Sequence, residues 1–203
     1  MPDPNNCLIK EYNLCFQFIC KAGNTSVKNL LVNYFCQKNE RNKIFARPEK
    51  KWKFCSKEKI PNNYITIGFC RHPESRILSC WKDKVWKQQD NFVAFKKHKI
   101  YKKDSFEKFI NTVCNISDKN ADQHFRSQTY DLNFSKINKL VKIETINQDW
   151  EEVRKLIKKE RGILLPILKN LNHTPKSQIN ISEEVRKKIQ NRYASDYEIL
   201  NYK

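Results

Sequence analysis

The feature that most constrains the fold is a unit of apolar run, polar turn and amphipathic segment that occurs twice in the chain. Residues Leu14–Cys20 are apolar apart from Gln17 and are followed by a polar turn. Beyond the turn, one face of a helix is formed by Val27, Leu30, Leu31, Tyr34 and Phe35. In the second unit, Tyr64–Cys70 is rich in β-forming residues, Arg71-His72 makes the turn, and Pro73 fits the first position of a helix. Strands that alternate with helices favour a parallel sheet.

Weaker signals extend this pattern along the chain. Leu140–Ile143 is a third strand candidate, and Asp104–Cys114 is a helix candidate. Caps are expected at Thr25 or Ser26 for the first helix and at Asp149, paired with Glu152, for the helix after the third strand; Gly162 is the expected stop of that helix. The last helix is expected to start near Ser182. The sequence therefore predicts a three-layer α/β fold with a mainly parallel central sheet, in a single domain over residues 1–203.

The charge of the chain points to anionic partners. Forty basic and 22 acidic side chains give a formal charge of +18, and two segments, Arg41–Lys59 and Lys82–Lys103, each carry a net +6. Nucleic acids, nucleotides, acidic sugars and acidic membrane surfaces are the partner classes that fit such a surface. The alternative is a solvated lysine surface with no partner.

The eight cysteines do not form a recognisable metal or disulfide pattern. C-x-x-C spacing is absent, and no histidine pair completes a zinc motif. We expect reduced thiols, a reducing compartment and a cytoplasmic protein. The longest N-terminal apolar run, Leu14–Cys20, is too short for a membrane span, so neither a signal peptide nor an anchor is expected.

The two polar turns are candidate anion sites. At the carboxyl end of a parallel strand, a tight turn presents backbone N–H groups and the positive end of the next helix. The first turn adds an ammonium, a glycine and two hydroxyls, in the order Lys21, Ala22, Gly23, Asn24, Thr25, Ser26. The spacing of a Walker A loop is absent. In the second unit, Arg71 suits bidentate contact with a phosphate, and Ser79 lies two turns into the helix. The alternative is a pair of ordinary turns with a surface arginine and serine.

These stretches resemble the donor site of sulfotransferases that use 3′-phosphoadenosine-5′-phosphosulfate (PAPS). The first turn resembles their P-loop-like 5′-phosphosulfate loop, and Arg71–Ser79 resembles their 3′-phosphate motif. The group most similar to this chain is the carbohydrate sulfotransferases of the chondroitin and dermatan type, in sulfotransferase family 2. Three further segments are similar to motifs of that group: Asp122–Gln128, Val141–Glu144 and Tyr193–Tyr202. The chain departs from the group at Cys20, Phe125 and Ser127, where proline, tryptophan and proline are usual.

The resemblance implies a mechanism and a set of roles. Lys21 would neutralise the bridging oxygen between sulfate and the 5′-phosphate; Thr25, Ser26 and the loop amides would hold that phosphate. Arg71 and Ser79 would hold the 3′-phosphate. No metal is implied. His124 is the expected general base by resemblance, with Glu144 and Asp83 as alternatives. Of the other histidines, His72 is expected in a turn, His98 in solvent and His173 in a loop.

The partner implied is a carbohydrate acceptor, with acidic oligo- and polysaccharides among the candidates. A specific nucleic-acid partner and a membrane span are not expected. Two alternatives stay open from the residues: a basic nucleic-acid-binding domain without catalysis, and an inactive relative that keeps nucleotide binding. The first lacks a helix-turn-helix, zinc or single-strand-binding signature.

Overall fold

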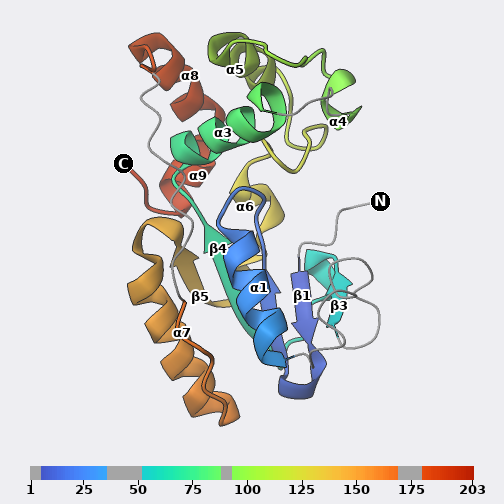
Figure 1. The fold of residues 1–203 in the computed structure, drawn as a ribbon, viewed down its shortest axis with the longest axis vertical. Coiled ribbons are helices and arrows are strands. Elements are labelled where there is room, and N and C mark those ends of the chain that lie inside the picture. Colours follow the sequence, from blue (N-terminus) through green and yellow to red (C-terminus); the bar gives the residue numbers. More distant parts are fainter. Residues whose placement is uncertain (1–5, 36–51, 88–92, 169–179) are drawn as a thin grey trace. The chain divides into compact units, whose positions relative to one another are not determined.

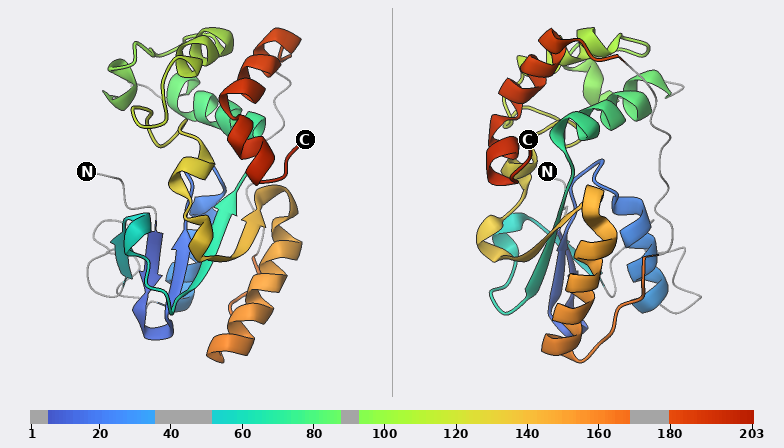
Figure 2. Two further views of the ribbon diagram at one scale, coloured as in Figure 1. Left: turned by 180° about the vertical axis from the view of Figure 1, so that it is seen from behind. Right: turned by 90° about the vertical axis from the view of Figure 1, so that its left-hand side faces the viewer.

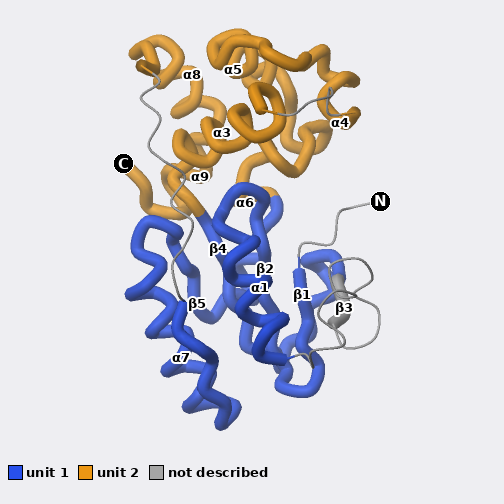
Figure 3. Tube along the Cα trace, in the orientation of Figure 1, with its two compact units in different colours: residues 1–70, 131–174 blue, residues 71–130, 175–203 orange. Residues whose placement is uncertain are grey.

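The computed structural model describes residues 6–35, 52–87, 93–168 and 180–203, drawn as ribbons in Figure 1 and Figure 2. The chain divides into two compact units (Figure 3). Unit 1 comprises residues 1–70 and 131–174, and unit 2 comprises residues 71–130 and 175–203. Each unit has its own buried core. One domain over residues 1–203 stays a prediction.

Unit 1 is built on a five-stranded sheet with the order β3-β1-β2-β4-β5. Its strands are β1 (Asn6–Ile9), β2 (Leu14–Gln17), β3 (Trp52–Cys55), β4 (Ile65–Cys70) and β5 (Ile137–Lys142). β2, β4 and β5 pair in parallel, whereas β1 pairs antiparallel with both β2 and β3. Among these five strands, only β1 therefore runs against the others, which confirms the predicted α/β fold with a mainly parallel sheet.

One face of this sheet carries the core of unit 1. Phe16 of β2, Phe18 just after it and Phe69 of β4 are fully buried and stack with centroid distances of 5.4 to 6.5 Å. Helices α1 (Asn24–Phe35) and α7 (Ile146–Arg161) both bury apolar residues in this cluster. The centroid of Trp150 of α7 lies 6.4 Å from that of Phe69. Both long helices of unit 1 therefore cover the same face.

Short segments cover the opposite face, so in unit 1 the predicted third layer consists of turns rather than long helices. Cys15 of β2 packs there with Ile60, just after the single turn η3 (Lys57–Lys59). Gln17 exchanges two hydrogen bonds with the main chain of Asn133, at 2.8 and 3.3 Å. The Asn133 side-chain amide in turn donates to the Lys57 carbonyl at 2.9 Å, which links these turns.

Helix α7 begins three residues before the predicted cap. Thr145 is its N-cap, and Asp149 lies inside its first turn, so the prediction that Asp149 caps the helix with Glu152 is wrong. The Asp149 carboxylate accepts instead from the Lys142 N–H at 2.9 Å and the Thr145 hydroxyl at 2.8 Å. It thereby joins the end of β5 to the start of α7. The predicted stop is confirmed, because Gly162 ends α7 with a φ of 70°.

Unit 2 is helical in its described residues. Its elements are α3 (Pro73–Trp81), the π-helical turn η4 (Lys82–Trp86), α4 (Val93–Lys96), α5 (Phe106–Cys114), α8 (Glu183–Arg192) and α9 (Ala194–Ile199); α6 (Gln128–Asp131) ends at its border with unit 1. Pro73 at the start of α3 confirms the sequence prediction. The predicted helix start near Ser182 is also confirmed, because α8 begins at Glu183 with Ser182 as its N-cap. The core gathers Phe95, Phe109 and Phe125 with residues of α3 and α8.

Candidate active site

The loop between β2 and α1 is a tight turn at the carboxyl edge of the parallel strands. The Ala22 N–H donates to the Ile19 carbonyl at 3.1 Å, and the Ala22 side chain is fully buried. Lys21 and Gly23 on either side have φ values of 69° and 68°, in the left-handed region. Loops with left-handed residues at such positions can direct successive backbone N–H groups toward one point, which is an anion-binding geometry.

Gly23 also lies against the end of β5. A Cβ atom at this position would be 2.6 Å from the Ile143 Cδ1 atom, so the loop packs closely on η6 (Ile143–Thr145). Helix α1 starts at Asn24, and the prediction of a cap at Thr25 or Ser26 is therefore wrong. Both hydroxyl residues lie in the first turn, where the backbone N–H groups have no carbonyl partner within the helix.

The Asn24 side chain is the clearest sign that the loop binds a polar group. Its Oδ1 atom is buried and has no hydrogen-bond partner among the described residues. Buried polar atoms are normally hydrogen-bonded. An amide that turns over presents its two N–H donors at the same position, so the loop fits an oxyanion.

Lys28 is a cation near this loop that the sequence prediction missed. It lies one turn after Asn24 in α1, and its Nζ is 4.8 Å from the centroid of the Phe18 ring. Burial lowers the Lys28 pKa, and the Cys20 and Cys7 thiols partly oppose that change. The i, i+4 spacing from Asn24 was a usable signal, because helical side chains point back toward the N-terminus.

The second half of the predicted donor site lies in unit 2, where Arg71 lies two residues before the first residue of α3. His72 is the N-cap residue and Pro73 opens the helix. Burial lowers the Lys82 pKa, and the charges of Lys87 and Arg71 lower it further. Lys82 follows Ser79 by three residues and therefore shares its helix face. Arg71, Ser79 and Lys82 thus provide cations and a hydroxyl in one region of unit 2, and Lys82 had been predicted only as part of a basic run.

His124, also in unit 2, is held by a neighbouring carboxylate. Its Nδ1 lies 2.6 Å from the Asp122 Oδ1, and its main-chain N–H donates to the same oxygen at 3.0 Å. Burial raises the Asp122 pKa, but the hydrogen bonds from His124 and the charges of His124 and Lys97 outweigh it, so the pKa is lowered. With the proton on Nδ1, Nε2 is left as the acceptor, which is the orientation a general base needs.

A buried arginine forms a hydrogen bond to the residue before His124. Arg76 of α3 has 1% of its surface exposed, and its Nη2 donates to the Gln123 carbonyl at 3.1 Å. The sequence prediction missed this contact because it joins residues 47 positions apart.

The other candidate bases have different surroundings. His98 is only partly exposed: its Nε2 is buried, its ring centroid lies 5.6 Å from that of Phe125, and burial lowers its pKa, so the prediction that it lies in solvent is wrong. Asp83 forms an ion pair with Lys84 at 3.5 Å, and Glu144 is exposed in η6 of unit 1. His72 lies in the predicted turn. His173 and most of Arg41–Lys59 lie outside the described residues.

Two further properties bear on the chemistry. Within the described ranges, no cluster of three or more histidine, cysteine or acidic side chains is arranged to hold a metal ion. No helix in the same ranges has the length and apolar character to cross a membrane.

Comparison with known proteins assigns the chain to a family. No curated protein and no solved structure matches the chain. A family model described as "Sulfotransferase family" matches residues 7–203, a stretch that includes the Lys21 loop, the Arg71–Ser79 segment and His124. The chain therefore belongs to the sulfotransferase family.

Proposed function

We propose that this chain transfers a sulfuryl group from PAPS to a hydroxyl group of a carbohydrate. Family membership makes the chain a sulfotransferase; the identities of donor and acceptor are the proposal. The observation that carries the donor assignment is the Lys21–Ser26 loop. It combines two left-handed residues, a buried Asn24 oxygen that has no hydrogen-bond partner in the described part of the chain, and the start of a 12-residue helix.

In this proposal the loop holds the 5′-phosphosulfate end of the donor. Its main-chain N–H groups and the Thr25 and Ser26 hydroxyls donate to the 5′-phosphate. The Lys21 ammonium acts at the bridging oxygen, where negative charge grows as the S–O bond breaks. Sulfuryl transfer resembles phosphoryl transfer in that positioning and charge stabilisation provide most of the catalysis.

The 3′-phosphate is assigned to the Arg71 segment. The Arg71 guanidinium can donate two parallel hydrogen bonds to a phosphate, and Ser79 and Lys82 add a hydroxyl and a second cation. The donor has two separate anionic groups, and the chain has two candidate anion-binding segments, one that follows β2 and one that follows β4.

His124 is the proposed general base for the acceptor hydroxyl. The Asp122 carboxylate orients its ring and stabilises the imidazolium that forms when Nε2 takes the proton. Glu144 is the alternative base, because it follows Ile143, the residue that packs on the Lys21 loop.

A polar groove in unit 2 supports the assignment of a carbohydrate acceptor. It has a volume of about 610 Å³ and is lined among others by Lys99, Lys108, Asn111, Thr112 and Asn115. Amide and hydroxyl side chains form hydrogen bonds to sugar hydroxyls, and lysines attract carboxylated or sulfated sugars.

A binding comparison tests the donor assignment. Adenosine 3′,5′-bisphosphate, adenosine diphosphate and a short DNA duplex are titrated against the full chain by calorimetry at low and at physiological salt. The proposal predicts selective binding of the bisphosphate that persists at physiological salt. Equal binding of both nucleotides, or a preference for DNA with a steep salt dependence, contradicts it.

A further inference from the structure

The starting observation is a side-chain clamp on the main chain of Arg71. The Gln128 Oε1 atom accepts from the Arg71 N–H at 2.9 Å, and the Gln128 Nε2 atom donates to the Arg71 carbonyl at 2.8 Å. Gln128 is fully buried. Both main-chain polar groups of Arg71 are therefore bonded to one side chain, 57 residues away in the sequence.

A buried carboxylate fixes the orientation of that amide. Asp196 of α9 is fully buried and accepts from the Gln128 N–H at 2.9 Å and from its Nε2 at 3.3 Å. Since a carboxylate only accepts, the nitrogen of the amide must face Asp196 and its oxygen must face the Arg71 N–H. The two exchanged bonds with Arg71 are then the only arrangement in which the amide satisfies all three groups.

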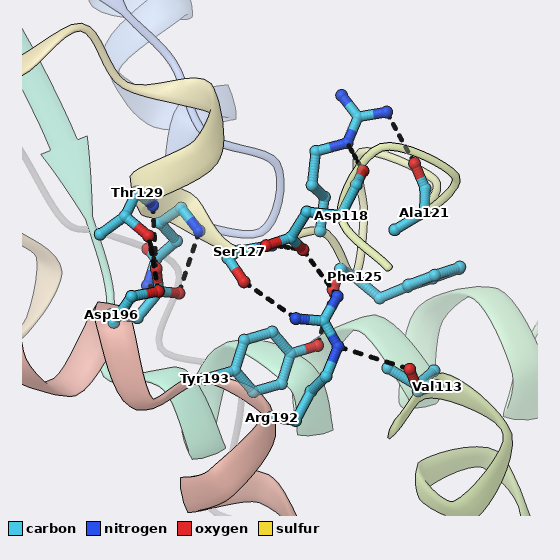
Figure 4. A network of polar contacts seen from close by, with 12 residues as sticks. Val113, Asp118, Ala121, Phe125, Ser127, Thr129, Arg192, Tyr193 and Asp196 are labelled. Atoms are coloured by element: carbon cyan, nitrogen blue, oxygen red, sulfur yellow. Dashed lines mark hydrogen bonds and ion pairs between the residues drawn. The ribbon is translucent and has the colours of Figure 1, made fainter. Parts of the chain in front are cut away.

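Asp196 is itself held in place by neighbouring contacts. It accepts from the Thr129 N–H at 2.8 Å and the Thr129 hydroxyl at 2.9 Å, and Figure 4 shows these two residues facing each other. Nearby, the Tyr193 hydroxyl donates to the Phe125 carbonyl at 2.6 Å, and Arg192 bonds to Asp118 and Ser127 at 2.6 and 3.0 Å. The start of α9 is thus joined to residues 118–129 at several points.

We propose that Gln128 and Asp196 are positioning residues that set the direction of the Arg71 side chain and thereby the selectivity for the 3′-phosphate of the donor. This inference rests on the proposed function. Arg71 lies between β4 and α3, and its N–H and carbonyl lie outside the hydrogen bonds of the α3 helix, which begin with the Arg76 N–H to the His72 carbonyl. The clamp fixes the peptide groups on both sides of its Cα. The direction in which a side chain leaves the backbone follows from those groups, and a small misplacement weakens a bidentate contact strongly.

The test compares two variants of the same network. Gln128→Leu removes the clamp at nearly constant volume, whereas Thr129→Val removes a hydrogen bond to the same Asp196 carboxylate without touching Arg71. For each, calorimetry gives the ratio of the Kd for adenosine 5′-monophosphate to that for adenosine 3′,5′-bisphosphate. We expect Gln128→Leu to lower this ratio by about tenfold, the scale of a lost charge-assisted contact. Thr129→Val should leave the ratio within about twofold of wild type, while lowering the melting temperature.

A double-mutant cycle shows whether the effect passes through Arg71. In the Arg71→Ala background, Gln128→Leu should cause no further loss of selectivity. If Gln128→Leu does not fold, Asp196→Asn, which keeps the shape of the side chain, is measured in its place and should also lower the ratio. An unchanged ratio in a folded Gln128→Leu or Asp196→Asn variant, or an additive loss in the Arg71→Ala background, overturns the inference. A wild-type protein that does not distinguish the two nucleotides overturns the proposed function instead.

Discussion

His124 and His98 lie in the same unit but in different surroundings. His124 has a carboxylate at its Nδ1, whereas the buried Nε2 of His98 has no partner among the described residues. A histidine that is oriented by an acceptor at one nitrogen and offers a lone pair at the other is suited to proton transfer. Of the two, His124 is the one whose ring is oriented by a carboxylate, so the proposal assigns the catalytic role to it.

We expect His124→Asn to lower the rate of sulfuryl transfer by about 10²- to 10⁴-fold, the usual contribution of a general base. Asp122→Asn should lower it less, because the ring stays in place but loses its charged partner. The measurement is single-turnover transfer to a glycan acceptor. Binding of adenosine 3′,5′-bisphosphate is the control and should match wild type. A wild-type rate for His124→Asn would exclude it as the base and favour Glu144.

At the scale of elements, the Lys21 loop depends on a backbone shape that glycine provides. Gly23 and Gly162 have nearly equal φ values of 68° and 70°. An added Cβ atom at Gly23 would contact Ile143, whereas an added Cβ atom at Gly162 would have no atom within 4 Å. Alanine at either position takes on the strain of the left-handed region, about 1 kcal/mol. The Ile143 δ-methyl group can move aside, so the two substitutions should cost similar stability.

Gly23→Ala and Gly162→Ala are therefore matched variants with different functional outcomes. We expect both to lower the free energy of unfolding by about 1 kcal/mol in urea denaturation. Only Gly23→Ala should weaken binding of the bisphosphate, because only that glycine lies in the proposed anion loop. Equal affinities in the two variants would show that the loop does not bind the donor.

The contact between β5 and α7 gives a second comparison at this scale. Asp149→Ala leaves the partly buried Lys142 N–H without an acceptor, and we expect a loss of about 1–3 kcal/mol of stability. Glu152→Ala removes only a surface ion pair with Lys139 and should cost less than about 1 kcal/mol. Equal losses in thermal or urea unfolding would show that the bonds of Asp149 contribute no more than the surface ion pair.

These elements show which parts of the structure the sequence could predict. Signals that lie within a few residues succeeded: Pro73 opens α3, a helix starts next to Ser182 and Gly162 ends α7. Which of several nearby polar residues caps a helix was predicted wrongly for α1 and α7. The turn at Gly23 lets α1 start at Asn24, and the Asp149 carboxylate accepts from the Lys142 N–H rather than capping α7.

Long-range contacts were the other part that the sequence could not show. The four-residue strands β1 and β3 have too little periodicity to be recognised on their own. The clamp of Gln128 on Arg71 spans 57 positions, and no local pattern encodes it. Lys28 and Lys82 had spacing signals, but the contact of Lys28 with Phe18 and the charge interaction of Lys82 with Arg71 are visible only in the fold.

At the scale of the whole molecule, the open question is what the formal charge of +18 does in a sulfotransferase. The proposal assigns part of the charge to acceptor binding, through Lys99, which lines the groove in unit 2, and through Lys96 and Lys102, which are exposed three residues away in the sequence. A solvated lysine surface would instead make the position of each charge unimportant. The two accounts differ in what happens when equal charge is removed at different places.

The matched variants are Lys96, Lys99 and Lys102 changed to Gln, and Lys155, Lys158 and Lys159 of α7 changed to Gln. Each set removes three exposed charges. We expect only the first set to raise the apparent KM for an acidic oligosaccharide, and to flatten its salt dependence. A neutral oligosaccharide is the control acceptor. Equal effects of the two sets would mean that the lysines act only through net charge.

The most direct test of the central claim is single-turnover sulfuryl transfer from PAPS by wild type and Lys21→Ala, with binding of adenosine 3′,5′-bisphosphate measured in parallel. Charge on the bridging oxygen grows in the transition state, so Lys21 should contribute to rate more than to affinity. We predict a fall in rate of about 10²–10³-fold with a much smaller change in Kd, and poor rescue by Lys21→Arg. A wild-type transfer rate in Lys21→Ala would contradict the account.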